Sequence, residues 1–236
     1  MNPHKLFLLL VLSLCASLPA LAQQRKAPTG GRIAVVVDER LAALRSTPEL
    51  TGNLVRRLSR GRLVAVRSAK TDRDGLTFFF VNVTTRTRGW IQRESLVFPS
   101  RSGDDLRLLR LIENSNGFDR ILRCRIFLDH FRRSPLRPQV LLILGDTAES
   151  LAAQLTSQVQ RRLNTNLGDA PEFSYLLNYT GLDRYNRQNV HFLFDRSTKR
   201  LHYDGSAWRD IIRRHPRSPE ASEASERLLN QPTHAP

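Results

Sequence analysis

The sequence predicts an α+β protein: a small β-barrel followed by an antiparallel α-helical domain that carries an inserted β-hairpin. Three observations support this prediction. Short strand-like runs crowd together before about residue 100, apolar residues recur at helical spacing after it, and a strand–turn–strand pattern interrupts the helical part at 190–203. Hydrophobic residues make up 40% of the 236-residue chain and charged residues 25%, a composition that excludes wholesale disorder and a polytopic membrane protein.

Residues 1–22 are typical of a secretory signal peptide. Lys5 gives it a positive start, an apolar run extends from Leu6 to Leu18, and Ala20-Leu21-Ala22 forms a cleavage site before Gln23. The apolar run is too short for a membrane-spanning helix. We therefore expect an exported protein, periplasmic or secreted, that is not integral to the membrane once the signal is cleaved.

Residues 32–98 carry the strand signals, after an expected linker at 23–31. The runs are β-branched or aromatic and are separated by turn residues. They are Ile33–Val37, Leu63–Val66, Thr77–Val83 and Gly89–Ile91. Several short strands within about 65 residues favour a closed barrel over an open sheet, because closure removes edges that a small sheet cannot cover.

A series of motifs runs through the same region. They are Ala43-Leu44-Arg45-Ser46 with Pro48, Gly52-Asn53-Leu54-Val55, Leu58–Val66, Phe78–Val83, and Arg88-Gly89-Trp90-Ile91 with Leu96-Val97. In this order they resemble a bacterial SH3 (SH3b) domain, although Phe78-Phe79-Phe80 stands where that family usually places a Trp. The resemblance implies a barrel that binds cell-wall peptides or peptide segments. The candidate ligand-binding residues on it are Arg45, Phe78, Phe80, Arg88 and Trp90.

Residues 104–229 carry helical patterns, after a linker at 99–103. A first helix is expected from Asp104 to about Asn114, and a second contains Phe118 and ends at Arg133-Ser134-Pro135. A long third helix from Arg137 to Leu163 has a continuous apolar stripe, which needs helical partners. The tail at 230–236 is expected to be disordered.

A short pattern recurs in the helical part. Ile126–Pro135 corresponds to Asp210–Pro219 at an offset of 84 residues, and both pieces close one amphipathic helix at Arg-Ser-Pro and start another. The pattern resembles the helix pairs of tetratricopeptide-type (TPR-like) repeats in envelope-assembly proteins. This resemblance implies a helical domain that binds a protein.

The insertion between the two units has two candidate functions. His191, Asp195, His202 and Asp204 suggest a metal-dependent enzyme or a cell-wall hydrolase, if the hairpin at 190–203 brings the four together. Strand alternation argues against it, since His202 and Asp204 need not share the face of His191 and Asp195. The chain has no nucleophile elbow and no Gly-rich phosphate loop, and Cys124 lies on an apolar stripe. We expect no catalytic residue, metal or cofactor.

A turn-rich stretch before the hairpin has the composition of a recognition segment. Its candidate ligand-binding residues are Tyr179, Arg184, Tyr185 and Arg187, because Tyr and Arg give a large contact area at low entropic cost. The alternative is that these tyrosines pack the hairpin onto the long helix.

The net charge of +15 is concentrated in the barrel region. Residues 23–100 hold 15 Lys and Arg against six Asp and Glu. A basic run there suits an anionic polymer, or is simply a solvated face; its members are Arg56, Arg57, Arg60, Arg62, Arg67, Lys70 and Arg73. The signal peptide and the lack of interleaved aromatics argue against specific nucleic-acid binding. The sequence therefore predicts a non-enzymatic envelope protein that binds a protein, a peptide or an anionic cell-wall polymer.

Overall fold

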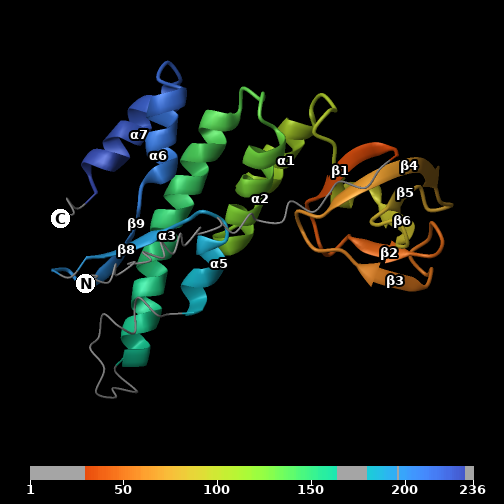
Figure 1. Ribbon diagram of the computed structural model, residues 1–236, viewed down its shortest axis with the longest axis horizontal. Helices are drawn as coiled ribbons and strands as arrows, with labels where there is room; N and C mark the ends of the chain where they lie inside the picture. Colours follow the sequence, from red (N-terminus) through yellow and green to blue (C-terminus); the bar gives the residue numbers. More distant parts are fainter. Residues whose placement is uncertain (1–29, 164–179, 196, 232–236) are drawn as a thin grey trace, which may run out of the picture.

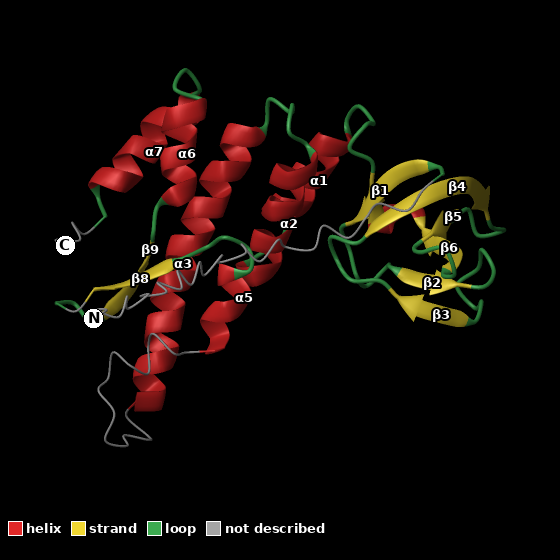
Figure 2. Ribbon diagram, in the orientation of Figure 1, coloured by secondary structure: helices red, strands yellow, loops and turns green. Residues whose placement is uncertain are grey.

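The computed structural model describes residues 30–163, 180–195 and 197–231. The fold is α+β, as predicted: a curled antiparallel sheet lies at one end, and helices with a two-stranded hairpin form the rest (Figures 1 and 2). The predicted signal peptide and most of the tail lie outside the described residues. Within these residues, no helix combines the length and apolar character that crossing a membrane requires.

The sheet has seven antiparallel strands in the order β3-β2-β6-β5-β4-β1-β7. The strands are β1 Arg32–Val36, β2 Ala43–Arg45, β3 Leu54–Arg57, β4 Leu63–Thr71, β5 Thr77–Asn82, β6 Arg88–Gln92 and β7 Leu96–Val97. Their alternation separates two faces. The inner face forms a buried cluster to which both ends of the sheet contribute, with Leu44 from β2 and Leu96 from β7. The sheet therefore curls over its own core, and Figure 1 shows β1 and β4 on the opposite side from β2 and β3.

The predicted closed barrel is not seen, because the end strands β3 and β7 do not pair in the described chain. The helical part occupies the β7 edge instead. The Arg107 guanidinium donates to the carbonyl oxygens of Leu96 (2.7 Å) and Glu94 (2.6 Å), and the Asp104 carboxylate accepts the Phe98 N–H (2.7 Å). One edge of the sheet is thus covered by α1, whereas the other edge, at β3, pairs with no further strand among the described residues.

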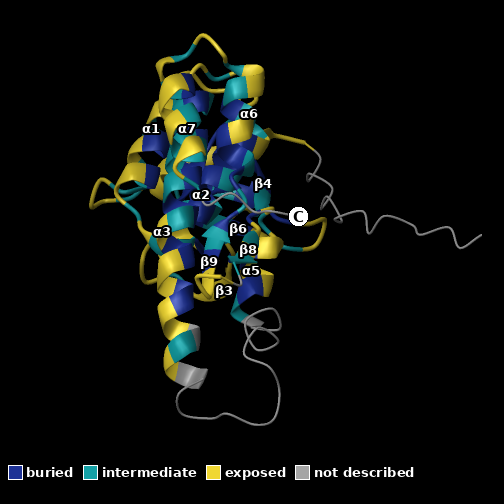
Figure 3. Cartoon of the chain, turned by 90° about the vertical axis from the view of Figure 1, so that its left-hand side faces the viewer, coloured by how far each residue is buried: buried dark blue, intermediate teal, exposed yellow. Residues whose placement is uncertain are grey.

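The helices and the hairpin assemble around α3. Apart from β7, the elements after β6 are η1 Arg93–Ser95, α1 Asp104–Glu113, α2 Gly117–His130, α3 Arg137–Leu163, η2 Thr180–Leu182, α5 Asp183–Asn186, β8 Phe192–Asp195, β9 Arg200–Tyr203, α6 Ser206–Arg214 and α7 Pro219–Leu229. The three predicted helices and the hairpin are confirmed. α3 packs against α2, α6 and β9, and buried and exposed residues alternate along it in Figure 3, as expected for a helix with one covered stripe.

The repeated Arg-Ser-Pro pattern gives two equivalent turns. At the first, Phe131 N donates to Phe127 O (2.8 Å) and Ser134 N to Phe131 O (3.2 Å). At the second, His215 N donates to Ile211 O (2.7 Å) and Ser218 N to His215 O (3.0 Å). Each donor and acceptor recurs at the same offset, so α2–α3 and α6–α7 are joined in the same way.

The sheet and the helices share a core. Val35, Val37 and Val97 belong to the same buried cluster as Leu108 of α1 and Phe127 of α2. Val35 lies on the outer face of the sheet, since its neighbours on β1 belong to the inner core. Helices therefore cover the outer face at its β1–β7 end.

Candidate functional site

The outer face of the sheet carries a row of side chains at its other end, across β3, β2, β6 and β5. The register pairs Leu54 with Arg45, Arg45 with Trp90, and Trp90 with Phe80. Directly paired residues of antiparallel strands stand on the same face. The Phe80 and Trp90 rings meet edge to face with their centroids 5.3 Å apart. We call Leu54, Arg45, Trp90 and Phe80 the outer row.

Alternation along each strand separates the outer row from the inner core. Leu44, Phe79 and Ile91, each adjacent in sequence to a member of the row, are buried in the inner cluster. Each member of the row keeps part of its surface exposed. The same alternation of apolar residues that builds the core thus fixes the direction in which the row faces.

A glycine allows β2 to approach β6 closely beside the row. A Cβ at Gly89 would lie 2.6 Å from the Arg45 carbonyl oxygen, a distance that real Cβ atoms do not show. The Arg45 guanidinium in turn donates to the Gly52 carbonyl oxygen (2.8 Å), across the connection between β2 and β3. This contact fixes the Arg45 guanidinium at the β2–β3 connection.

The outer row is flanked by cations. Arg57, Lys70 and Arg88 are exposed and stand on the same face. None of the positions that the register gives to this face of β2–β6 is Asp or Glu. The described strands therefore place aromatic surface and positive charge together on this face, with no carboxylate at any of their positions on it.

The five candidate residues predicted on the sheet differ in access. All five stand on this face, but Phe78 is fully buried and offers no surface to a ligand. Arg45, Phe80, Arg88 and Trp90 remain accessible.

A cleft of about 640 Å³ opens between the β2–β3 connection and the tip of the β4–β5 hairpin. Its walls mix charges, with Glu49 on one side and with Lys70, Asp72, Arg73 and Asp74 on the other. The Asp72 carboxylate accepts the backbone N–H groups of Asp74 (3.0 Å) and Leu76 (2.8 Å), which fixes the hairpin turn. The cleft lacks the single sign of charge that marks the outer face.

The basic run predicted from the sequence is spread over the sheet. Arg56 and Arg57 lie on β3, whereas Arg67 and Lys70 lie on β4, and three strands separate β3 from β4 in the sheet order. Arg73 is in the turn after β4. Arg62 donates to the Val83 carbonyl oxygen (3.3 Å).

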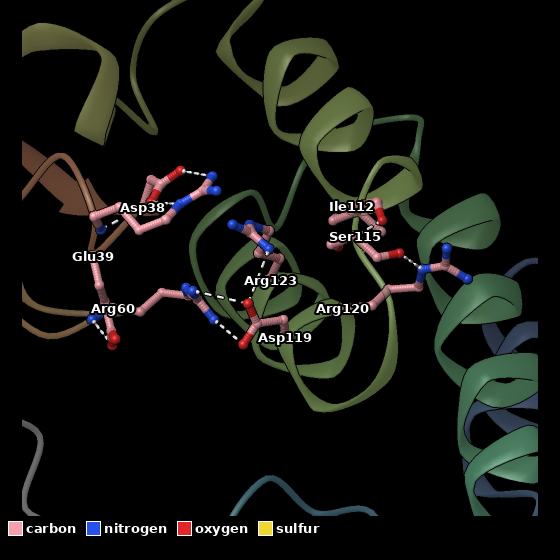
Figure 4. A network of polar contacts seen from close by, with 9 residues as sticks. Asp38, Glu39, Arg60, Ile112, Ser115, Asp119, Arg120 and Arg123 are labelled. Atoms are coloured by element: carbon pink, nitrogen blue, oxygen red, sulfur yellow. Dashed lines mark hydrogen bonds and ion pairs between the residues drawn. The ribbon is translucent and has the colours of Figure 1, made fainter.

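Arg60, the remaining member of the run, belongs to the junction between sheet and helices. Its guanidinium forms a bidentate contact with the Asp119 carboxylate of α2, at 2.8 and 3.3 Å, and its backbone N–H donates to Glu39 (2.8 Å). Arg123, one turn along α2, lies 3.8 Å from the same carboxylate. Figure 4 shows Arg60 reaching across from the sheet unit toward Asp119 and Arg123. We call Arg60, Asp119 and Arg123 the junction cluster.

The cations of the junction cluster are desolvated. The side chains of Arg60 and Arg123 are only 8% and 6% exposed. Burial lowers the pKa of Arg123, and the nearby Arg60 charge lowers it further. Hydrogen bonding from Arg60 holds the pKa of Asp119 below its ordinary value. Within the described chain, the Nε atoms of both arginines are buried without a hydrogen-bond partner, so the cluster depends strongly on its shared carboxylate.

Sequence reasoning missed Asp119 and Arg123. A signal was present, because Arg123 adjoins Cys124 in the apolar pattern of α2, where a cation is out of place. The spacing of four residues between Asp119 and Arg123 is also that of a helical ion pair.

The four candidate residues predicted before the hairpin also differ in exposure. Tyr185 is fully buried between Phe118 and Phe192, with ring centroids 5.1 and 5.3 Å away. Arg184 lies over the Phe118 ring at 4.9 Å and donates to the Tyr185 hydroxyl (2.7 Å), while Arg187 is exposed. Tyr185 thus packs the hairpin region onto the helices, and Tyr179 lies outside the described residues.

The four His and Asp residues of the hairpin region have separate partners. Asp195 accepts from the hydroxyls of Ser197 and Thr198, both at 2.7 Å. His202 Nδ1 lies 3.2 Å from the Glu149 carboxylate of α3.

The remaining two residues do not complete a site. Asp204 accepts the Ser206 N–H (2.9 Å) at the start of α6, and the His191 side chain is exposed. In the described residues, no three His, Cys, Asp or Glu side chains gather as a metal site would require.

Cys124 is fully buried in the helical core, and this burial raises the pKa of its thiol to about 12. At neutral pH it carries no thiolate that could attack a substrate.

Comparisons with known protein families, curated proteins and solved structures found no match for this chain.

Proposed function

We propose that this chain is an exported, non-enzymatic binding and scaffold protein of the bacterial cell envelope, whose sheet unit binds a peptide or an anionic cell-wall component. The outer row with its flanking cations carries the proposal. Trp and Arg dominate recognition surfaces because they combine apolar area with charge-assisted hydrogen bonding. Trp90 and Arg45 are paired here on a face whose described strand positions include no Asp or Glu.

Two features support the finer parts of the proposal. The curled sheet with a self-contained inner core fits the SH3b resemblance of the motifs. The two equivalent turns of α2–α3 and α6–α7 fit the TPR-like resemblance, and with it a helical region that binds a protein. The separate partners of His202 and Asp195 weigh against the hydrolase alternative.

The chain supplies its own reporter for a test. It contains two tryptophans, Trp90 on the outer face and Trp208, which is buried between the helices. A Trp208→Phe variant leaves Trp90 as the only indole. We expect poly-glutamate to change Trp90 emission saturably at physiological salt, because a bound chain would contact the indole.

The matched control is a Trp90→Phe variant, in which Trp208 reports. Its emission should stay constant over the same titration. No saturable response of Trp90 to poly-glutamate or to polyphosphate would contradict the proposed function of the sheet unit.

A further inference from the structure

We propose that the open edge of β3 binds an extended, acidic peptide segment by strand addition. The peptide backbone pairs with β3, and its carboxylates lie against the arginines of that strand. This inference rests on the proposed function of the sheet unit and names the ligand class and its mode of docking.

The first support is the position of β3. It is the last strand in the sheet order and pairs only with β2 in the part of the chain that the structure describes. The pairing is bracketed by Ser46 N donating to Asn53 O (3.0 Å) and Leu58 N donating to Ala42 O (2.9 Å). The register shifts between Leu44 and Arg45, so the pairing with β2 is irregular there. The backbone groups of β3 that do not pair with β2 lie on its outward side.

The second support is the exposure of the strand. All four residues of β3 are exposed, and the apolar Leu54 and Val55 are 51% and 49% exposed. Leu50, in the connection before it, is exposed to a similar degree. The opposite edge at β7 is covered by Arg107 of α1, so the two edges of this sheet differ in their exposure.

The positive charge of β3 indicates which kind of segment binds at its edge. Arg56 and Arg57 are adjacent on β3, and Arg45 lies beside them on β2. A second copy of the chain would bring another such pair of arginines against the first, and like charges across neighbouring strands repel. An acidic segment meets the opposite situation. Arg56 and Arg57 are adjacent on the strand and point to opposite faces, so a carboxylate on either face of the added segment meets one guanidinium and forms charge-assisted hydrogen bonds with it.

Backbone chemistry favours a peptide over another polyanion. The edge of a strand presents N–H donors and carbonyl acceptors together, and only another peptide backbone satisfies both. Leu54 is also the first member of the outer row. A strand added about 4.8 Å beyond β3 would extend that row by one side chain, so edge and face form one continuous surface.

The test uses the whole protein and a fluorescein-labelled peptide of about eight residues in which Glu alternates with Val. Two further peptides carry N-methyl groups on alternate amides, one set in each register. We expect one methylated peptide to bind about tenfold more weakly and the other to bind like the parent, because only one set of amides faces β3.

Charge reversal provides the second arm. The variant Arg56→Glu/Arg57→Glu should bind the Glu–Val peptide at least about tenfold more weakly and should gain affinity for the matching Lys–Val peptide. The control is Arg86→Glu/Arg93→Glu, which makes the same charge change at two exposed arginines of the sheet unit away from β3. It should keep most of the affinity for the Glu–Val peptide.

The outcomes separate the inference from the function on which it rests. Equal binding of both methylated peptides, with Trp90 still responding, would overturn strand addition and leave the sheet unit a binding module. Strand addition of a foreign peptide would also be overturned if the peptide dispersed dimers of the protein, since the edge would then belong to a second copy. Absence of any saturable response of Trp90 to the peptides or to polyphosphate would overturn both proposals.

Discussion

The junction cluster and the outer row use arginine in opposite ways. Arg60 and Arg123 are buried and share the Asp119 carboxylate, whereas the outer face places Arg45 next to Trp90 with no acidic position among its strands. Each of these arginines adds the same charge to the chain. The difference shows that an arginine indicates an anionic ligand only when its partners within the fold are known.

The largest expected effect tests whether the junction cations depend on their carboxylate. Asp119→Ala should lower the free energy of unfolding by about 2 kcal/mol, because it leaves two desolvated guanidiniums without their shared partner. Asp119 is also in the first turn of α2, where a negative charge stabilises the helix. Urea denaturation followed by circular dichroism measures the change.

Asp129→Ala is the matched control for that variant. Asp129 lies on the same helix and is 58% exposed, against 57% for Asp119, and it pairs with Arg125 at 3.6 Å. Its removal should change the free energy of unfolding by less than about 0.5 kcal/mol, as for an exposed pair. Equal losses from both variants would show that the junction cluster is an ordinary surface ion pair.

The second prediction concerns acid. Hydrogen bonding from Arg60 lowers the pKa of Asp119, and hydrogen bonding from Arg40 lowers the pKa of Asp38 beside the junction. Folding therefore gains stability from both carboxylates above their ordinary pKa of 3.8, and this gain is lost as the pH falls through the lowered folded values. The free energy of unfolding should decline below about pH 4.

The pH series also distinguishes the two regions. In Asp119→Ala the decline below about pH 4 should be shallower, because one of the two groups no longer titrates. A variant of the outer row should keep the slope of the native protein. An unchanged slope in Asp119→Ala would assign the acid sensitivity to carboxylates elsewhere.

The third prediction concerns Trp90 in the outer row. Trp90→Ala should weaken binding of the labelled Glu–Val peptide about tenfold, as for an aromatic anchor at the centre of a contact surface. The loss of its contact with Phe80 should lower the free energy of unfolding by about 1 kcal/mol. Fluorescence anisotropy measures the binding, and Trp208→Phe, a change at a buried position, should leave the affinity unaltered.

The sequence predicted the individual helices and strands more accurately than the way in which they pack together. The expected helix from Arg137 to Leu163 matches α3, because a continuous apolar stripe is a local property of the chain. The prediction of a closed barrel was wrong. Arg107 of α1 contacts the β7 edge, and this contact joins a helix to a strand that the sequence assigns to a different unit. Edge coverage depends on tertiary packing, which strand spacing does not encode.

The candidate site was predicted in part for the same reason. Arg45, Phe80 and Trp90 were found from their motifs, and their shared face follows from a strand register that the sequence alone did not fix. Arg60 was grouped with the exposed basic run because its partner, Asp119, lies 59 residues away. Contacts at such separation leave no periodic signal in either segment.

The smallest expected effect asks whether position or net charge governs binding. Arg88→Gln removes one exposed cation at the start of β6, beside the outer row, and should weaken binding of the Glu–Val peptide about threefold at physiological salt. Arg217→Gln makes the same change in charge at the exposed turn between α6 and α7 and should leave the affinity nearly unchanged, because screening cuts off interactions beyond about 8 Å. Raising the salt should narrow the difference between Arg88→Gln and the native protein. If both variants weakened binding equally, the attraction would belong to the charge of the whole chain, and the contrast between the outer row and the junction cluster would have no bearing on recognition.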